Sequence, residues 1–127
     1  MFVFDTNILI YYAAGEERVV SFLNEHQHSI FYIPSIVAAE FLSYPLITES
    51  SVNAFREFVY QTTMINLDFS LAEHAAVLRR THRVKLMDAV VAATALAINA
   101  TLVTRNTRDF KKISELRILN PFENTPQ

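Results

Sequence analysis

Short runs of β-branched, aromatic and other apolar residues alternate along the chain with longer helix-forming stretches, and this alternation restricts the possible folds more than any other feature. The strand-like runs cover residues 1–4, 29–33, 62–67, 101–104 and 116–119. The helix-like stretches cover residues 8–12, 18–25, 36–42, 50–61, 70–82 and 89–98. Strands that alternate with helices pair in parallel through right-handed crossovers. The sequence therefore predicts a three-layer α/β/α fold around a central parallel sheet of four to five strands.

The domain organisation follows from length and composition. A chain of 127 residues falls in the range of one domain, and a hydrophobic content of 51% with a single glycine is typical of a packed core with short connections. No internal repeat or Gly/Ser-rich linker divides the sequence. We expect one domain over residues 1–127, with a core of about 1–121 and a loose C-terminal tail at 122–127.

The absence of cysteine excludes disulfides, thiolate nucleophiles and cysteine-ligated zinc, and it fits a reducing compartment. The N-terminus carries no basic segment followed by a long apolar stretch, and no apolar run reaches membrane-spanning length. We therefore expect a cytoplasmic location and no membrane association.

The net charge of −2 hides an uneven distribution. Residues 1–78 hold two basic and nine acidic side chains, whereas residues 79–127 hold nine basic and four acidic ones. A basic second half can contact phosphates, although such blocks of charge are also common on solvated helix faces. Charge alone therefore leaves binding of nucleic acid open.

Four acidic residues follow or interrupt apolar segments. Asp5 directly follows the first strand, and Asp109 lies shortly after the strand at 101–104. Glu40 sits inside an apolar helical stretch, and Asp88 precedes the most apolar helix. Ligands of parallel α/β sheets bind beyond the carboxyl ends of the strands. Carboxylates that converge there repel one another unless they are protonated or bound to cations, so the set predicts a site for Mg²⁺ or Mn²⁺.

Each acid taken alone also has a structural interpretation. Asp5 and Asp88 are suited to capping helices, because aspartate is favoured at the N-cap and in the first turn. Glu40 is free to point outward, and Asp109 is free to pair with a neighbouring basic residue on the surface. Only the set of four favours the metal site.

The order and spacing of these residues resemble the PIN-domain family over nearly the whole chain, from Phe4 to about Pro121, and the length is similar to that of VapC-type toxins of bacterial toxin–antitoxin pairs. The motifs that carry the resemblance are Phe4-Asp5-Thr6-Asn7, Ala39-Glu40-Phe41-Leu42, Asp88-Ala89 with Ala92-Ala93-Thr94-Ala95, and Leu102-Val103-Thr104-Arg105-Asn106 with Asp109-Phe110. No single motif is specific, but the ordered set is.

The resemblance implies a PIN-like endoribonuclease that depends on Mg²⁺ or Mn²⁺. The acidic positions that match the metal-binding and catalytic residues of the family are Asp5, Glu40, Asp88 and Asp109. The residues expected to hydrogen-bond and orient these carboxylates are Thr6, Asn7, Thr104 and Asn106. Asn7 and Asn106 suit turns or helix caps equally well, because asparagine is favoured there. The basic residues beside Asp109 that are placed to contact RNA phosphates are Arg105, Arg108, Lys111 and Lys112. Resemblance to the toxin branch further implies a homodimer and a small antitoxin protein as partner.

One position departs from the pattern, because many relatives carry proline before the third acidic residue and this chain has Met87. The change puts only the local start of the helix in doubt. All four acidic positions are occupied.

Two other classes of α/β protein fit the same residues less well. A haloacid dehalogenase-type phosphatase usually needs a second aspartate two positions after the first, and that position is Asn7. A receiver-like signalling domain expects paired acids after the first strand, which Thr6 and Asn7 do not provide. The serious alternatives are a PIN-like module that only binds RNA or a protein, and an RNA-processing nuclease without an antitoxin.

Overall fold

The computed structural model of this chain describes residues 1–123. The strands are β1 (Phe2–Phe4), β2 (Phe31–Pro34), β3 (Thr63–Ile65), β4 (Thr101–Val103) and β5 (Ile118–Leu119). The helices are α1 (Thr6–Ala13), α2 (Glu17–Glu25), α3 (Ser35–Leu42), α4 (Glu49–Tyr60), α5 (Phe69–His82), α6 (Leu86–Ala97) and α7 (Thr107–Phe110). The expected alternation of strands and helices is confirmed.

The five strands form one sheet in the order β3-β2-β1-β4-β5, and every pairing is parallel. The chain moves outward from β1 to β2 and β3, and then crosses back to add β4 and β5 on the other side of β1. The order of the strands therefore reverses between β1 and β4. At such a switch point the loops after the two strands diverge and leave a crevice, where ligands of open α/β sheets bind.

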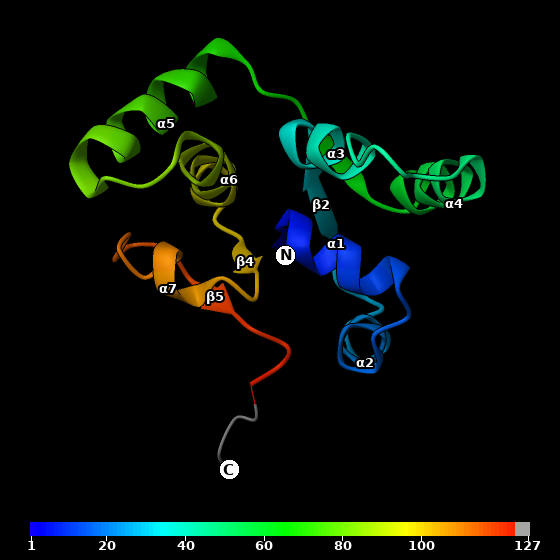
Figure 1. Ribbon diagram of the computed structural model, residues 1–127. Coiled ribbons are helices and arrows are strands. Elements are labelled where there is room, and N and C mark those ends of the chain that lie inside the picture. Colours follow the sequence, from blue (N-terminus) through cyan, green and yellow to red (C-terminus); the bar gives the residue numbers. More distant parts are fainter. Residues whose placement is uncertain (124–127) are drawn as a thin grey trace.

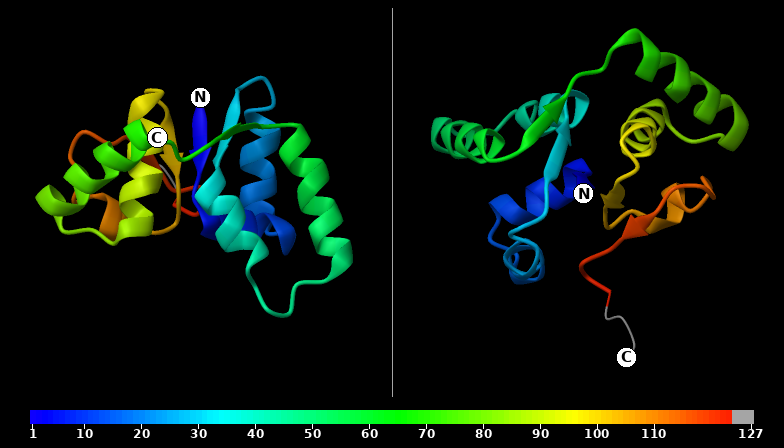
Figure 2. Two further views of the ribbon diagram at one scale, coloured as in Figure 1. Left: turned by 90° about the horizontal axis from the view of Figure 1, so that it is seen from above. Right: turned by 180° about the vertical axis from the view of Figure 1, so that it is seen from behind.

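Helices cover both faces of the sheet. Helices α1, α2 and α4 lie on one side, and α5, α6 and α7 lie on the other (Figure 1). The two further views agree with this arrangement (Figure 2). Helix α3 contacts both α1 and α6. The three helices α1, α3 and α6 thus meet beyond the carboxyl ends of the central strands.

The core is built from the apolar strands and from α6. Val3 and Phe4 of β1 and Leu102 and Val103 of β4 have no exposed surface, as expected for central parallel strands covered on both faces. Seven consecutive residues of α6, from 89 to 95, are buried. The helix begins at Leu86 with Lys85 at its N-cap, so Met87 in place of proline does not prevent the helix from starting before Asp88.

Helix α3 has Pro34 at its N-cap, and the hydroxyl of its first residue, Ser35, accepts a hydrogen bond from the Leu67 N–H. Phe122, the first residue of the tail expected at 122–127, packs its ring against Tyr11 and Arg105. The remainder of that tail, residues 124–127, lies outside the described residues. Within residues 1–123, none of the helices is long and apolar enough to cross a membrane.

Candidate active site

Asp5 lies at the switch point of the sheet. Its backbone N–H donates to the Val103 carbonyl at 3.1 Å, which joins the end of β1 to the end of β4. Asp5 is also the N-cap of α1, where its Oδ1 accepts from the Thr6 N–H at 2.9 Å. Only 8% of the residue is exposed. The capping role considered for Asp5 is therefore real, and it leaves the second carboxylate oxygen free for other partners.

That second oxygen, Oδ2, is held by two side chains. The Thr104 hydroxyl donates to it at 2.7 Å, and the Asn7 amide Nδ2 donates to it at 3.1 Å. The same Nδ2 lies 3.3 Å from the Thr104 hydroxyl oxygen, which also accepts from the Asn106 N–H at 2.9 Å. Thr104 lies 99 positions from Asp5 and 97 positions from Asn7 in the sequence, yet the three side chains are hydrogen-bonded and fix the orientation of the Asp5 carboxylate.

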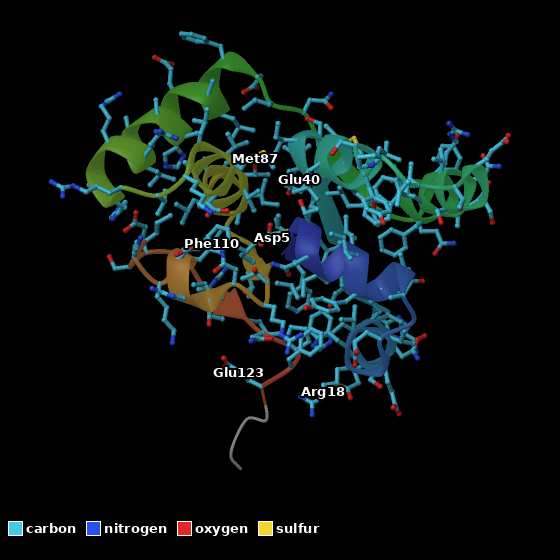
Figure 3. All side chains as sticks on the ribbon, viewed as in Figure 1. Asp5, Arg18, Glu40, Met87, Phe110 and Glu123 are labelled. Carbon is cyan, nitrogen blue, oxygen red and sulfur yellow. The ribbon has the colours of Figure 1, made fainter. Side chains whose placement is uncertain are left out.

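Three acidic residues from separate elements line one cavity of about 950 Å³. They are Asp5 at the start of α1, Glu40 on α3 and Asp88 in the first turn of α6. The same three residues line an adjoining cavity of about 360 Å³. Figure 3 shows Asp5 and Glu40 next to each other where α1, α3 and α6 meet, with Met87 on the α6 side of the same region. The structure therefore brings these three predicted residues together.

Asp109 lies nearby without lining either cavity. It is on α7, half-buried, and its Oδ2 accepts a hydrogen bond from the Asn106 Nδ2 at 3.1 Å. Asn106 itself lines both cavities. Asp109 is close enough for its charge to act on Asp88. It therefore belongs to the acidic cluster electrostatically but sits at its periphery.

Burial and neighbouring carboxylates raise the pKa values of Asp5 and Asp88. Burial raises the pKa of Asp5 above its usual range, and the charge of Glu40 adds to this, while hydrogen bonds from Thr104, Thr6 and Asn7 act in the opposite direction. Burial and then the charges of Asp5 and Asp109 raise the pKa of Asp88 to about 6. A cluster that resists ionisation in this way is stabilised by a positive charge placed in its midst.

The donor set fits a hard divalent cation. Carboxylate oxygens are the ligands that Mg²⁺ and Mn²⁺ prefer. Thr6 is one of the residues that line the larger cavity, and its buried hydroxyl has no hydrogen-bond partner among residues 1–123. As the side chains stand, no three His, Asp or Glu residues of the described chain form a ready metal-holding group. The carboxylates thus share a cavity but would have to converge further to coordinate one ion.

Comparison with known proteins settles the family. The sequence model of the PIN domain matches residues 2–116, which is most of the chain. The chain belongs to the PIN domain family. No curated protein sequence matches it significantly.

Solved structures share the fold of this PIN domain over its whole length. A toxin–antitoxin complex from Klebsiella pneumoniae is 29% identical, with a TM-score of 0.84 over 98% of this chain and 100% of that one. VapBC2 from Rickettsia felis, bound to a DNA fragment from its promoter, is 26% identical, with a TM-score of 0.82 over 94% and 97%. FitAcB from Neisseria gonorrhoeae is 25% identical, with a TM-score of 0.77 over 98% and 100%.

Sequence reasoning missed one charged residue at this site of the PIN domain. Lys85 is exposed, lines the smaller cavity together with the three acids, and its charge acts to lower the pKa of Asp88. The only signal in the sequence was its position three residues before Asp88. Among the residues that line the two cavities it is the sole cation.

The larger cavity also has an apolar arm that the sequence did not indicate. Ile10 of α1 and Tyr44 and Leu46 of the α3–α4 connection line it, and these side chains are 54%, 58% and 76% exposed. The connection falls between two predicted helices and carries no periodic pattern. The α3–α4 connection lies beside the acidic residues only because α1 packs against α3.

The basic residues predicted to contact RNA lie on the exposed surface around α7, and their role stays a prediction. Arg108, Lys111 and Lys112 are exposed. Arg105 is also exposed, but its guanidinium group is engaged with the aromatic rings of Tyr11 and Phe122.

Proposed function

We propose that this PIN domain is a metal-dependent endoribonuclease that hydrolyses phosphodiester bonds of RNA and serves as the toxin of a VapBC-type toxin–antitoxin pair. The observation that carries the proposal is the convergence of Asp5, Glu40 and Asp88 on one cavity at the switch point of the sheet, with the pKa values of two of them raised. Membership of the PIN family supports hydrolysis of nucleic acid.

Asp5, Glu40, Asp88 and Asp109 are the residues proposed to hold Mg²⁺ or Mn²⁺. A divalent cation bound there supplies Lewis acidity toward the phosphate and lowers the pKa of a coordinated water. Asn7 and Thr104 keep the Asp5 carboxylate oriented, and Asn106 does the same for Asp109. Hydrolysis of this kind needs no side-chain nucleophile, in keeping with a chain that has no cysteine.

Basic residues at the rim are proposed to hold the RNA. Lys85 borders the smaller cavity, and its ammonium group is proposed to contact a phosphate oxygen next to the cleaved bond. Arg108, Lys111 and Lys112 are proposed to contact phosphates further along the strand. Such contacts fix the position of the RNA without reading its bases.

The decisive experiment compares RNA cleavage by the intact chain with that by Asp5→Asn and Asp88→Asn, in Mg²⁺, in Mn²⁺ and in excess chelator. Both substitutions keep the size of the side chain and remove its charge. Asp68→Asn is the matched control, because Asp68 caps α5 on the exposed surface, where asparagine caps equally well.

We expect metal-dependent cleavage by the intact chain and by Asp68→Asn, and a loss on the order of a thousandfold in the two site variants, since each removes several kcal/mol of charge stabilisation. Equal activity in all four proteins would contradict the nuclease proposal and favour a PIN-like module that binds RNA or a protein.

The antitoxin partner and a homodimer belong to the same proposal. The toxin–antitoxin complexes described above support the partner. An apolar groove of about 240 Å³ lined by Ile36, Leu67 and Leu86 supports pairing of two copies, because Leu67 and Leu86 are 43% and 55% exposed. A reducing cytoplasm is the proposed location.

These assemblies have direct tests. We expect the purified chain to run as a dimer in light scattering and Leu86→Glu to run as a monomer, and a monomeric wild type would contradict the dimer. A neighbouring gene for a small DNA-binding protein that blocks cleavage when co-expressed would support the toxin assignment. Its absence would favour a nuclease of RNA maturation or decay.

A further inference from the structure

The C-terminal segment reaches back to the loop that follows β4. Arg105 of that loop places its guanidinium carbon 4.1 Å from the ring centroid of Phe122 and 5.2 Å from that of Tyr11 on α1. The Arg105 Nη1 donates to the Tyr11 hydroxyl at 2.9 Å, and the two aromatic rings meet edge to face at 4.8 Å. We call Tyr11, Arg105 and Phe122 the C-terminal clasp.

A turn after β5 presents Phe122 to the clasp. The Asn120 Oδ1 accepts from the Phe122 N–H at 2.9 Å, and the Asn120 carbonyl accepts from the Glu123 N–H at 3.2 Å. Arg18 on α2 donates to the Phe122 carbonyl oxygen. Figure 3 shows Arg18 and Glu123 at the same end of the molecule. The backbone of Phe122 is thus held by hydrogen bonds within the turn and by Arg18 on α2, and this fixes the position of its ring.

A short chain of hydrogen bonds connects the clasp to Asp5. The backbone N–H of Arg105 donates to the Asn7 Oδ1 at 3.1 Å, and the Nδ2 of the same amide donates to the Asp5 Oδ2 at 3.1 Å. Because an amide group is rigid and planar, a donor that holds its oxygen also fixes the direction of its nitrogen. The position of the Arg105 backbone therefore sets one of the hydrogen bonds that orient the Asp5 carboxylate, the one from Asn7.

We propose that Arg105 and Phe122 are positioning residues, which hold residue 105 against Asn7 and thereby keep Asp5 oriented for a cation. The inference rests on the proposed function for the meaning of that orientation, but the clasp itself is a property of the fold. The clasp accounts for Arg105, whose guanidinium lies over the Phe122 ring and donates to the Tyr11 hydroxyl although acidic residues are near. It also gives the last described residues of the chain a role at the site.

The experiment removes and then restores the aromatic ring. Phe122→Ala abolishes stacking on Arg105, Phe122→Trp keeps an aromatic face for the guanidinium, and Phe69→Ala is the control because Phe69 is 77% exposed and distant in sequence from the clasp. The two readouts are hydrogen exchange of the Arg105 backbone amide by NMR, and the affinity of the full chain for Mn²⁺ alone by calorimetry. Tyr11→Phe removes only the hydroxyl that accepts from Arg105, and serves as the milder variant if Phe122→Ala does not fold.

We expect Phe122→Ala to speed Arg105 exchange about 2- to 30-fold, the range that loss of a cation–π contact produces. Mn²⁺ binding should weaken by about tenfold, the lower end of the effect of disturbing groups that orient metal ligands. Phe122→Trp should restore both values, and Tyr11→Phe should shift both in the direction of Phe122→Ala. Phe69→Ala should shift neither.

Unchanged Arg105 exchange in both Phe122→Ala and Tyr11→Phe would overturn the clasp. Faster exchange with unchanged Mn²⁺ affinity would overturn its positioning role. If the nuclease proposal fails, the wild-type chain neither binds Mn²⁺ nor cleaves RNA. Faster exchange in Phe122→Ala would still support the clasp as a feature of the fold.

Discussion

The two halves of the acidic site are built differently. On the strand side, Asp5 is 8% exposed and its two oxygens accept hydrogen bonds from the Thr6 backbone, Thr104 and Asn7. On the helix side, Glu40 is exposed, and its hydrogen bonds with the Ser43 hydroxyl and the Ser43 N–H both use the Glu40 backbone carbonyl. The shifted pKa of Asp88 has burial and charge as its causes and no hydrogen bond. The Asp5 carboxylate is thus held in place by hydrogen bonds, whereas the carboxylates of Glu40 and Asp88 are not.

This difference suggests a division of roles. A carboxylate that is already oriented loses little freedom when it binds a cation, whereas Glu40 and Asp88 have to be drawn together by it. The strand side would then define where an ion sits, and the helix side would close around it. Four measurements, beginning with the one expected to change most, probe the two sides of the site and the neighbouring Lys85.

Addition of Mg²⁺ or Mn²⁺ should stabilise the chain, because an ion that binds only the folded state shifts the unfolding equilibrium. We expect about 2.7 kcal/mol at a metal concentration 100 times the Kd, or about 10 °C in the midpoint of thermal unfolding. The shift should be lost in Asp88→Asn and kept in Asp68→Asn. An equal shift in Asp88→Asn would mean that the helix side takes no part in binding.

Thr104→Val should weaken metal binding although Thr104 is not itself a proposed ligand. The substitution keeps the shape of the side chain and removes the hydroxyl that donates to Asp5, so we expect Mn²⁺ affinity to fall about 10- to 100-fold in calorimetry. Thr94→Val is a matched control, because the Thr94 hydroxyl is equally buried but donates to the Val90 carbonyl within α6. Equal losses in both variants would show general damage to the core rather than the loss of one hydrogen bond to Asp5.

The stability of the metal-free chain should fall as the pH rises from about 4 to above 6. The pKa of Asp88 is raised from 3.8 to about 6, so the folded state binds the proton more tightly than the unfolded state does. Protonated Asp88 therefore stabilises the fold fully below the pKa of the unfolded state, 3.8, and this stabilisation is lost as the pH rises through the pKa of the folded state, about 6. For a half-exposed group the effect is about 1 kcal/mol after solvent screening. Urea unfolding in chelator at pH 4.5 and 7.5 should show this decrease, and Asp88→Asn should reduce it. If the free energy of unfolding of Asp88→Asn falls by as much as that of the wild type, the decrease comes from other ionisable groups.

Lys85→Gln should weaken RNA binding only a few-fold and lower its dependence on salt. Removal of one contact to a single-stranded phosphate reduces the slope of log K against log salt concentration by about 0.7. Binding of a labelled RNA to the Asp5→Asn variant, with and without Lys85→Gln, at several salt concentrations measures the slope without cleavage. An unchanged slope would remove Lys85 from the RNA-contacting residues.

Local sequence patterns are enough to predict most of the elements and the class of fold. Continuous apolar runs such as Phe2–Phe4 predict buried parallel strands, and the near-complete absence of polar residues from 89 to 98 predicts a buried helix, because each pattern follows from local burial. Motif order also pointed to the four acidic residues. Short elements were less accessible, since α7 has four residues and too little sequence for a periodic pattern.

The tertiary structure alone decided which of those residues meet and how. Asp5 and Thr104 are hydrogen-bonded because β1 and β4 are neighbours in the sheet, and that pairing depends on the order of strands rather than on either segment. The placement of Lys85 at the cavity and of Phe122 over Arg105 likewise depends on where distant elements pack. Local sequence fixes what each segment becomes, whereas contacts between residues about a hundred positions apart depend on the packing of the whole chain.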